Sequence, residues 1–286
     1  MKNLKKIGLI GCGEVGSLLL AQLNMLLRDV QFYILDHNLE HGGKYLDLKH
    51  ALIHQNNALF FNEHEGMESI DLLFYAAGVP NPPGIDRSVM AHQNKSIIES
   101  IFKTLQFKQN IPIIVLANPV EASCFWIDQV TQQMHFILGT GTLLDTYRLR
   151  ALIPEEKQAL VLGEHGPKMF ILQESINTKD FQWDAWNQQL KGLATEIRRT
   201  EMGTKYGVVA SAIQLMQNLA NLKDFPLPYC RKINDQLQQL LKVNHPIYVN
   251  HHLNAEKFAE LFSSFSSKDQ AHLMAAAQQI EKLSLI

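Results

Sequence analysis

Residues 5–16 have the sequence KKIGLIGCGEVG, and this stretch decides the fold. The apolar run over residues 6–10 is short and is closed by a glycine, which indicates a buried strand. Directly after the glycines, apolar residues recur at helical spacing on one side, at Val15, Leu18, Leu19, Leu23 and Leu26. The stretch therefore predicts a strand that turns into a helix through a glycine-rich loop.

The same change from strand to helix recurs through the first half of the chain. Further apolar runs predict strands at residues 31–35, 71–75, 111–116 and 136–138. Helical spacing predicts helices at residues 97–105 and 142–149, while three prolines keep residues 79–84 out of regular structure. Strands that alternate with helices favour a parallel, doubly wound sheet.

The second half follows a looser pattern. Helical spacing covers residues 185–199 and 208–222, either as two helices or as one long kinked helix, and residues 270–283 predict a final helix. No flexible linker separates the halves, so we expect them to pack tightly. The predicted fold is α/β: a Rossmann-type doubly wound parallel sheet over residues 1–140, followed by a mixed α/β domain over residues 141–286.

Composition narrows the class of protein. The 286 residues include 26 Lys and Arg against 28 Asp and Glu, a net charge of −2, and 46% are hydrophobic. This balance excludes wholesale disorder and gives no reason to expect a nucleic-acid partner or an anionic membrane surface. No apolar stretch approaches the roughly 18 residues of a membrane span, and the run over residues 7–12 is too short for a secretory signal. Three scattered cysteines indicate free thiols, so we expect a cytoplasmic protein.

The glycine-rich loop matches the pattern G-x-G-x-x-G at a turn from strand to helix. In such a turn the first glycine permits the tight bend, the second lets a pyrophosphate approach the backbone, and the third lets helix and strand pack closely. Asp36 follows Gly16 by twenty residues, at the end of the second predicted strand. A carboxylate there accepts a hydrogen bond from a ribose hydroxyl and repels a 2′-phosphate, which favours NAD over NADP. The alternative is an ordinary strand–helix turn with a solvated Asp36.

Three further segments carry polar residues where loops of an open sheet would border a ligand. The proline-rich loop contains Asn81 and leads to Arg87. Asp145 and Arg148 lie three residues apart on one face of a predicted helix, and His165 stands between glycines after an apolar run. Each has an ordinary structural explanation alone, but together they could polarise a carbonyl, bind a carboxylate and exchange a proton.

In this combination the sequence resembles the NAD-dependent L-lactate/malate dehydrogenases, and it is closer to the L-lactate dehydrogenases. The resemblance covers about residues 5–170 in the family's order. It is carried by residues 11–16 with Asp36, 45–50 (YLDLKH), 76–87 (AAGVPNPPGIDR), 118–120 (NPV), 139–150 (GTGTLLDTYRLR) and 163–166 (GEHG).

The resemblance implies hydride transfer between NAD and a small 2-hydroxy or 2-oxo acid, with specific roles for the matching residues. His165 would exchange the proton at the substrate oxygen, Asp145 would orient His165, and Arg87 would polarise the carbonyl from a closing loop. Arg148 would bind the substrate carboxylate through two parallel hydrogen bonds, and Asn118 would contact substrate or cofactor near the nicotinamide. The implied cofactor-binding residues are Gly11, Gly13, Glu14, Val15, Gly16, Asp36, Gly78 and Asn94.

The resemblance also bears on the substrate. The family position that contacts the substrate side chain is six residues before the loop arginine, which here is Asn81. Malate enzymes typically carry arginine there and lactate enzymes glutamine, so the neutral Asn81 favours a monoacid such as pyruvate. Pro167 departs from the family pattern, and either Thr204 or Lys205 lines the pocket. Lys205 could bind a second carboxylate, which leaves a malate enzyme as one alternative and a non-catalytic NAD-binding sensor or partner protein as another.

Other ligands and partners are not favoured. Twelve histidines occur without a metal-binding motif, so we expect no metal site. Basic pairs such as residues 198–199 form no stripe with aromatics, which argues against a nucleic-acid partner. Residues 225–265 match no part of the family pattern. Because the family forms dimers and tetramers, the resemblance implies a homodimer or homotetramer.

Overall fold

The computed structural model describes residues 4–37, 42–79, 87–200 and 203–286. Its centre is one sheet in the order β10-β9-β6-β5-β4-β1-β2-β3. The strands are β1 (Lys6–Ile10), β2 (Gln31–Leu35), β3 (Ala58–Phe61), β4 (Leu72–Tyr75), β5 (Pro112–Val115), β6 (Phe136–Gly139), β9 (Tyr229–Lys232) and β10 (Tyr248–His251). β1 to β6 pair in parallel, which confirms the predicted doubly wound α/β sheet.

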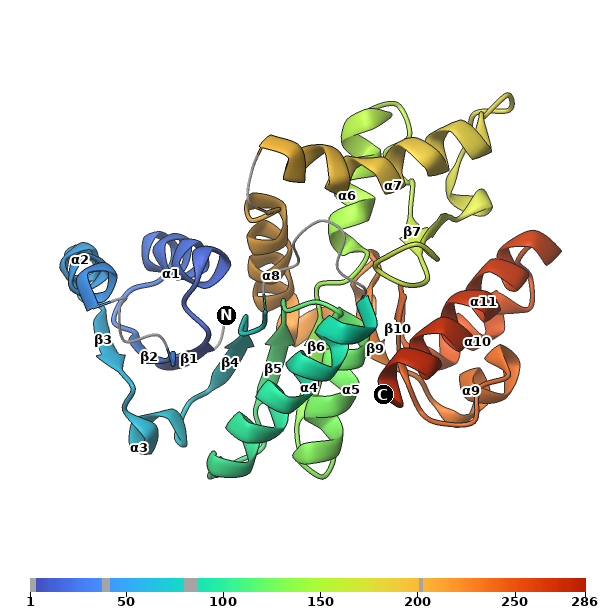
Figure 1. Ribbon diagram of the computed structural model, residues 1–286. Coiled ribbons are helices and arrows are strands. Elements are labelled where there is room, and N and C mark those ends of the chain that lie inside the picture. Colours follow the sequence, from blue (N-terminus) through green and yellow to red (C-terminus); the bar gives the residue numbers. More distant parts are fainter. Residues whose placement is uncertain (1–3, 38–41, 80–86, 201–202) are drawn as a thin grey trace.

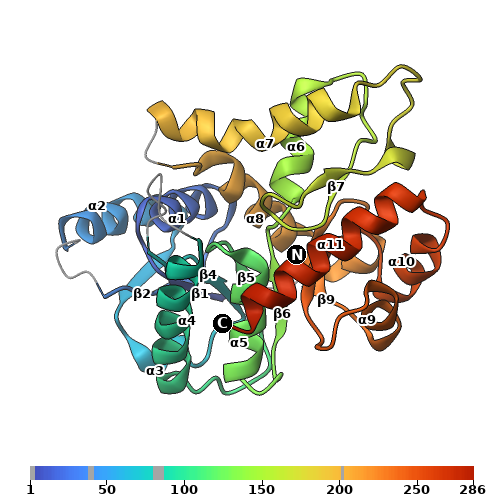
Figure 2. The same ribbon diagram turned by 45° about the vertical axis from the view of Figure 1, so that its right-hand side comes forward.

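Helices cover both faces of this sheet (Figures 1 and 2). They are α1 (Glu14–Leu26), α2 (Gly42–Leu52), α3 (His64–Met67), α4 (Arg87–Thr104), α5 (Val120–Val130), α6 (Leu143–Leu152), α7 (Trp183–Thr200), α8 (Tyr206–Asn218), α9 (Asp235–Leu241), α10 (Ala255–Phe262) and α11 (Ser267–Ser284). Short 3-10 turns cover residues 53–55, 173–175 and 219–224. α7 and α8 are separate helices that run in different directions, so the alternative of one kinked helix is wrong.

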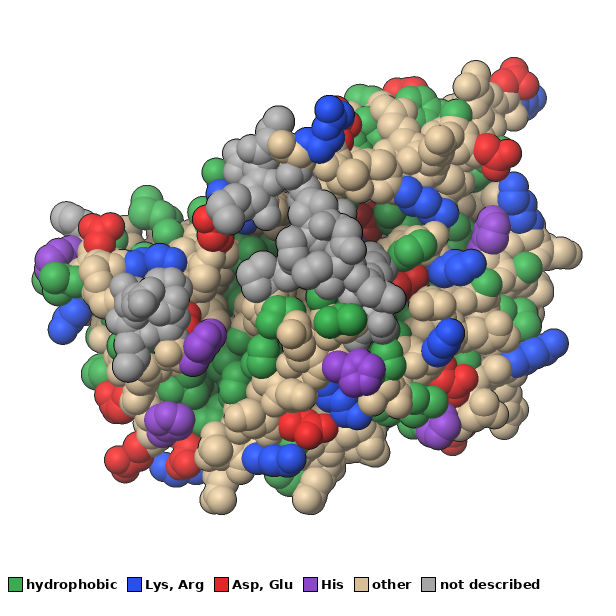
Figure 3. Space-filling model, in the orientation of Figure 1, with side chains coloured by type: hydrophobic (Ala, Val, Ile, Leu, Met, Phe, Trp, Pro, Cys, Tyr) green, Lys and Arg blue, Asp and Glu red, His purple; other side chains and the backbone are tan. Residues whose placement is uncertain are grey.

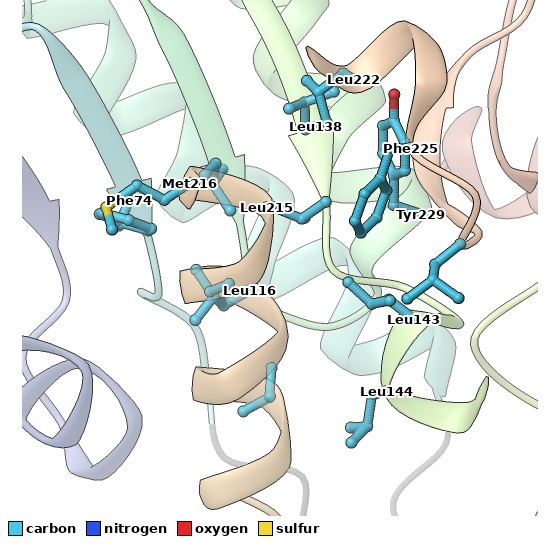
Figure 4. Close-up of a cluster of buried hydrophobic side chains, with 14 of the residues drawn as sticks. Phe74, Leu116, Leu138, Leu143, Leu144, Leu215, Met216, Leu222, Phe225 and Tyr229 are labelled. Carbon is cyan, nitrogen blue, oxygen red and sulfur yellow. The ribbon is translucent and has the colours of Figure 1, made fainter. Parts of the chain in front are cut away.

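Alternate residues of each central strand enter two different cores, which explains the continuous apolar runs. In β4, Phe74 packs in the core that contains α1 and α8, while Tyr75 packs in the core beneath α4 and α5. Figure 4 shows Met216 of α8 lying against Phe74. A strand that is buried on both faces needs apolar residues throughout, as parallel sheets between two helix layers do.

The second half of the chain completes the sheet. β9 pairs antiparallel with β6 where Gly139 faces Cys230, and β10 pairs antiparallel with β9. A side chain at Gly139 would bring its Cβ within 2.9 Å of the Cβ of Cys230, so glycine permits this approach. No element was predicted for residues 225–265, where the structure has β9 and β10; β9 ends in Arg231 and Lys232 and lacks an apolar run. The predicted division near residue 140 falls between β6 and α6 and stays a prediction.

The remaining strands form a small hairpin that continues this extension. β7 (Val161–Leu162) pairs antiparallel with β8 (Phe170–Ile171), and Gly163 forms an isolated bridge with Asn250 of β10. Since β1, β4, β5 and β6 are parallel, their carboxyl ends lie at one edge of the sheet. The loops that leave this edge, together with the β7–β8 turn, supply the residues of the candidate site.

Candidate active site

The turn between β1 and α1 is tight and closely packed. Gly11 has φ +86°, and a side chain there would place its Cβ 2.5 Å from the backbone N of Ala77. A Cβ at Gly16 would lie 2.0 Å from the carbonyl O of Gly11. Glycine is therefore required at both positions, the first for its backbone conformation and the second because the helix packs directly on its own loop.

The open side of this turn fits a dinucleotide. A Cβ at Gly13 would meet no atom within 4 Å, and Gly13 is the N-cap of α1, whose free N–H groups attract phosphate. Asp36 follows β2, and its Oδ2 accepts a hydrogen bond from the backbone N of Cys12 at 2.7 Å. Lys44 Nζ donates to the carbonyl O of Cys12 at 3.3 Å. Val15 is half-buried against the core.

Three predicted residues meet at the end of β6. Asp145, in the first turn of α6, is fully buried, and its Oδ2 lies 2.6 Å from Nδ1 of His165. Its other oxygen, Oδ1, accepts from Nη1 of Arg148 at 2.9 Å. The His165 and Arg148 side chains keep 17% and 11% of their surface exposed. One buried carboxylate thus holds both side chains, which still reach the surface of the site.

Burial and charge act in opposite directions on the two titratable groups. Burial lowers the pKa of His165, but the charge and hydrogen bond of Asp145 and the charge of Glu121 outweigh burial and raise that pKa above its usual value. Burial raises the pKa of Asp145, but His165 and then Arg148 outweigh it, and the pKa of Asp145 is lowered. The pair therefore favours a charged Asp145 beside a His165 that binds its proton more tightly than a free imidazole.

A second carboxylate holds the His165 backbone in place. Glu121, buried in the first turn of α5, accepts a hydrogen bond from the backbone N of His165 at 2.6 Å. Its Oε1 also accepts from the Nδ2 of Asn250, in β10. Sequence reasoning missed both residues. The signal for Glu121 was its position directly after the NPV motif, and the signal for Asn250 was a polar residue directly after the short apolar run of residues 247–249.

Asn250 joins three segments around the site. Its Oδ1 accepts from the backbone N of Thr142 at 3.0 Å, and its Nδ2 donates to the carbonyl O of Gly163 at 2.8 Å. A Cβ at Gly141, where φ is +42°, would overlap the Asn250 side chain. This amide therefore fixes the turn before α6 against the turn that carries His165.

Asn118, Asn94 and Gly78, three further predicted site residues, lie close together. Asn118 is exposed after β5, and Asn94 is buried in α4. Asn94 Oδ1 accepts from the backbone N of Val79 at 2.8 Å, and its Nδ2 donates to the carbonyl O of Asn118 at 2.6 Å. Gly78 leaves space for this amide, since its Cβ would lie 3.2 Å from Asn94 Oδ1. Asn94 thus joins the two loops, and its predicted contact with the cofactor stays a prediction.

Arg87 lies next to a gap in the described residues, and Asn81 lies within that gap. Arg87 is the first residue of α4. Thr204 is half-buried, and Lys205 is the N-cap of α8. Its Nζ lies 3.1 Å from Oε2 of Glu14, the first residue of α1.

Comparison with known proteins agrees with this geometry. Residues 5–135 match the family model described as "lactate/malate dehydrogenase, NAD binding domain". The L-lactate dehydrogenase 2 of Lactiplantibacillus plantarum is 28% identical over 246 residues, which are 77% of this chain and 78% of that protein. Over residues 5–135 the chain is therefore similar to the NAD-binding domain of the lactate/malate dehydrogenase family.

The similar proteins include both lactate dehydrogenases and malate dehydrogenases. A malate dehydrogenase of Geotalea uraniireducens is 31% identical over 58% of this chain and 56% of that protein. The crystal structure of Cryptosporidium parvum malate dehydrogenase superimposes with a TM-score of 0.79 at 22% identity, covering 99% of this chain and 98% of that one, and it shows the shared fold. The matched family model describes an NAD-binding domain, so NAD is the cofactor of the first half of the chain.

The surface of the protein adds little about other ligands. Among the described residues, no group of three or more His, Cys, Asp or Glu side chains could hold a metal ion. Every helix in the described part is too short or too polar to cross a membrane. On the face in Figure 3, the described Lys and Arg side chains are spread among acidic ones and form no continuous basic stripe.

Proposed function

We propose that this chain is an NAD-dependent L-2-hydroxyacid dehydrogenase, an oxidoreductase that transfers a hydride between NAD(H) and a small 2-oxo or 2-hydroxy acid. The observation that carries the proposal is the pair of contacts on Asp145, with Nδ1 of His165 at 2.6 Å and Arg148 at 2.9 Å. Buried ionisable groups are costly to keep unless they are paired or used. These lie at the edge of the sheet where the NAD-binding turn also lies.

The arrangement supports a separate role for each residue of the site in the reduction of a 2-oxo acid. NADH, when bound, supplies the hydride that reaches C2. His165, held through Nδ1 by Asp145, donates the proton from Nε2 to the carbonyl oxygen, so that the product is the neutral hydroxyl. Arg148 has five N–H donors and uses Nη1 toward Asp145, and others can bind the substrate carboxylate. Asn118, from the loop after β5, and Arg87, at the start of α4, would contact the reacting groups.

We assign NAD to residues 1–140 and most of the substrate contacts to residues 141–286. The substrate we favour is an L-lactate/pyruvate-type monoacid. Asn81 is neutral, and an unpaired second carboxylate in a closed site would cost several kcal/mol. The amine that could bind such a carboxylate, on Lys205, lies instead against Glu14. The similar proteins include both lactate and malate dehydrogenases, so a malate/oxaloacetate enzyme is the alternative.

The test is NADH oxidation by the purified protein with pyruvate, 2-oxobutyrate, branched 2-oxo acids and oxaloacetate. We expect turnover on at least one monoacid, with a kcat/KM above that for oxaloacetate. A preference for oxaloacetate would replace the monoacid assignment by the malate alternative. NADH binding without turnover of any of these acids would contradict the enzymatic proposal and favour a non-catalytic NAD-binding protein.

The raised pKa of His165 predicts the pH dependence of 2-oxo acid reduction. The reaction needs protonated His165, so kcat/KM should be high at low pH and fall as pH rises through a pKa above the usual 6.5. Glu121→Gln keeps the hydrogen-bond acceptor but removes a charge that raises this pKa. The descending limb should therefore move to lower pH in that variant. A limb that Glu121→Gln leaves in place would contradict this assignment.

We also propose that the chain forms a homodimer or homotetramer. Large apolar side chains are exposed where α1 and α2 end, at Met25, Leu26 and Ile53. Asn24 Nδ2 donates to the carbonyl O of Ala51, which holds these two helix ends together. Large apolar side chains exposed on neighbouring helix ends are typical of a contact with another chain. Sedimentation should give an assembly larger than the monomer, and Ile53→Lys should weaken it; a monomeric wild type would contradict the proposal.

A further inference from the structure

The start of α8 lies between the cofactor-binding turn and the catalytic helix. On one side Lys205 Nζ lies 3.1 Å from Oε2 of Glu14, across 191 positions of sequence. On the other side Gly207 packs on α6: its Cβ, if present, would lie 2.5 Å from Cδ1 of Leu144, the residue before Asp145. The absence of a side chain at Gly207 lets α8 approach this closely. Lys205 is thereby placed beside the G-x-G-x-x-G turn.

Glu14 is an unfavourable residue for the ligand that this turn receives. It is the first residue of α1, next to the open side of Gly13, and its side chain is 58% exposed. A carboxylate in this first turn interacts well with the helix dipole. The diphosphate of a dinucleotide uses the same positive helix end, however, so the Glu14 charge repels it. A neighbouring positive charge would offset this repulsion.

Lys205 supplies a charge of the right sign at this place. Its side chain is only 23% exposed, so solvent screens it less than a free surface lysine. The ammonium group has three N–H donors, which can donate to the Glu14 carboxylate and to a phosphate oxygen at the same time. Lys44, whose Nζ donates to the carbonyl O of Cys12, brings a second positive charge to the same loop.

We propose that Lys205 is a cofactor-binding residue: it neutralises Glu14 and binds the diphosphate of NAD from the start of α8. The proposal deepens the proposed function, because it assigns Lys205 to the cofactor and removes it from recognition of a second substrate carboxylate. It depends on NAD binding and not on turnover, so it can be tested even if no substrate is found.

The experiment measures the Kd of NADH by fluorescence titration for the wild type and for Lys205→Met, Glu14→Gln and the double variant. We expect Lys205→Met to raise the Kd by about ten- to a hundredfold, the usual size for a charged hydrogen bond. Glu14→Gln should lower the Kd or leave it unchanged. In the Glu14→Gln background, Lys205→Met should raise the Kd by a smaller factor, because part of the effect of Lys205 is to offset the charge of Glu14.

Controls separate a local effect from a general one. Lys103→Met removes the same charge from a surface pair with Glu99, where Nζ and Oε2 are 3.4 Å apart, and should leave the Kd unchanged. Displacement of NADH by ADP-ribose should weaken in Lys205→Met, while displacement by adenosine, which lacks phosphate, should not. If Lys205→Met is unfolded by circular dichroism, Lys205→Arg replaces it and should keep the Kd within a fewfold of wild type.

The proposal is overturned if folded Lys205→Met binds NADH within twofold of the wild type. It is also overturned if Lys103→Met weakens binding equally or if adenosine is affected as much as ADP-ribose. An unchanged Kd together with a selective rise in the KM for oxaloacetate would return Lys205 to the substrate site. Absence of turnover in the wild type would contradict the enzymatic proposal and leave these binding results valid.

Discussion

His165→Asn is expected to lower the kcat for 2-oxo acid reduction by about a hundred- to ten-thousandfold, the usual contribution of a positioned acid or base. Asparagine can still accept or donate a hydrogen bond toward Asp145, but it cannot deliver a proton at neutral pH. The Kd of NADH should stay near the wild-type value, because the cofactor turn lies on β1 and α1. Steady-state NADH oxidation and fluorescence titration measure the two quantities separately.

A matched substitution shows whether this loss is specific. His135 is also buried, and its Nδ1 accepts a hydrogen bond from the backbone N of Ile111 at 3.3 Å. It lies directly before β6, whereas Asp145 lies in α6, after that strand. His135→Asn should therefore change stability more than kcat. If His165→Asn retains full turnover, or if both variants lose it equally, the proposed proton transfer is wrong.

Asn250→Leu is expected to lower the free energy of unfolding by about 3–5 kcal/mol, because it removes one hydrogen bond from the buried Glu121 carboxylate and leaves two buried backbone groups without their partner. Leucine has a similar volume but cannot donate to Glu121 or Gly163, nor accept from Thr142. Because Glu121 also holds the backbone of His165, kcat should fall in the protein that remains folded. Urea unfolding and turnover per folded molecule measure the two effects.

Asn57 offers the comparison for this variant. It is buried, donates to Asn24 Oδ1 at 2.8 Å and to the carbonyl O of Leu27 at 3.0 Å, and accepts from the backbone N of Val30 at 2.9 Å. Asn57→Leu should also destabilise the fold, yet leave kcat per folded molecule unchanged. Wild-type stability in Asn250→Leu, or equal losses of kcat in the two variants, would contradict the role of Asn250 as the support of His165.

Much of the first half could be predicted because its signals are local. β1 and β2 have the predicted bounds, and α1 begins one residue before the predicted helix. An apolar pattern within about a dozen consecutive residues indicates each of these elements. β9 could not be found this way, because Arg231 and Lys232 occupy half of it and its pairing depends on the space left by Gly139.

The candidate site also contains some residues whose relation is local in sequence and others whose relation is not. The sequence by itself determined the cofactor turn and the Asp145–Arg148 pair, since glycine spacing and a helical i,i+3 relation involve residues a few positions apart. The resemblance supplied His165, but its 2.6 Å approach to Asp145 depends on the turn after β7. That turn takes its position from contacts with other elements.

Only the tertiary structure decided which distant groups meet. Sequence reasoning left Thr204 and Lys205 open as pocket residues and gave no partner to Glu14, whereas the packing of α8 on α1 and α6 brings Lys205 to Glu14. In the same way, the addition of β10 to the sheet brings Asn250 beneath the His165 turn. The physical reason is that local patterns record which face of an element is buried, while contacts between polar groups far apart in the chain depend on how whole elements pack.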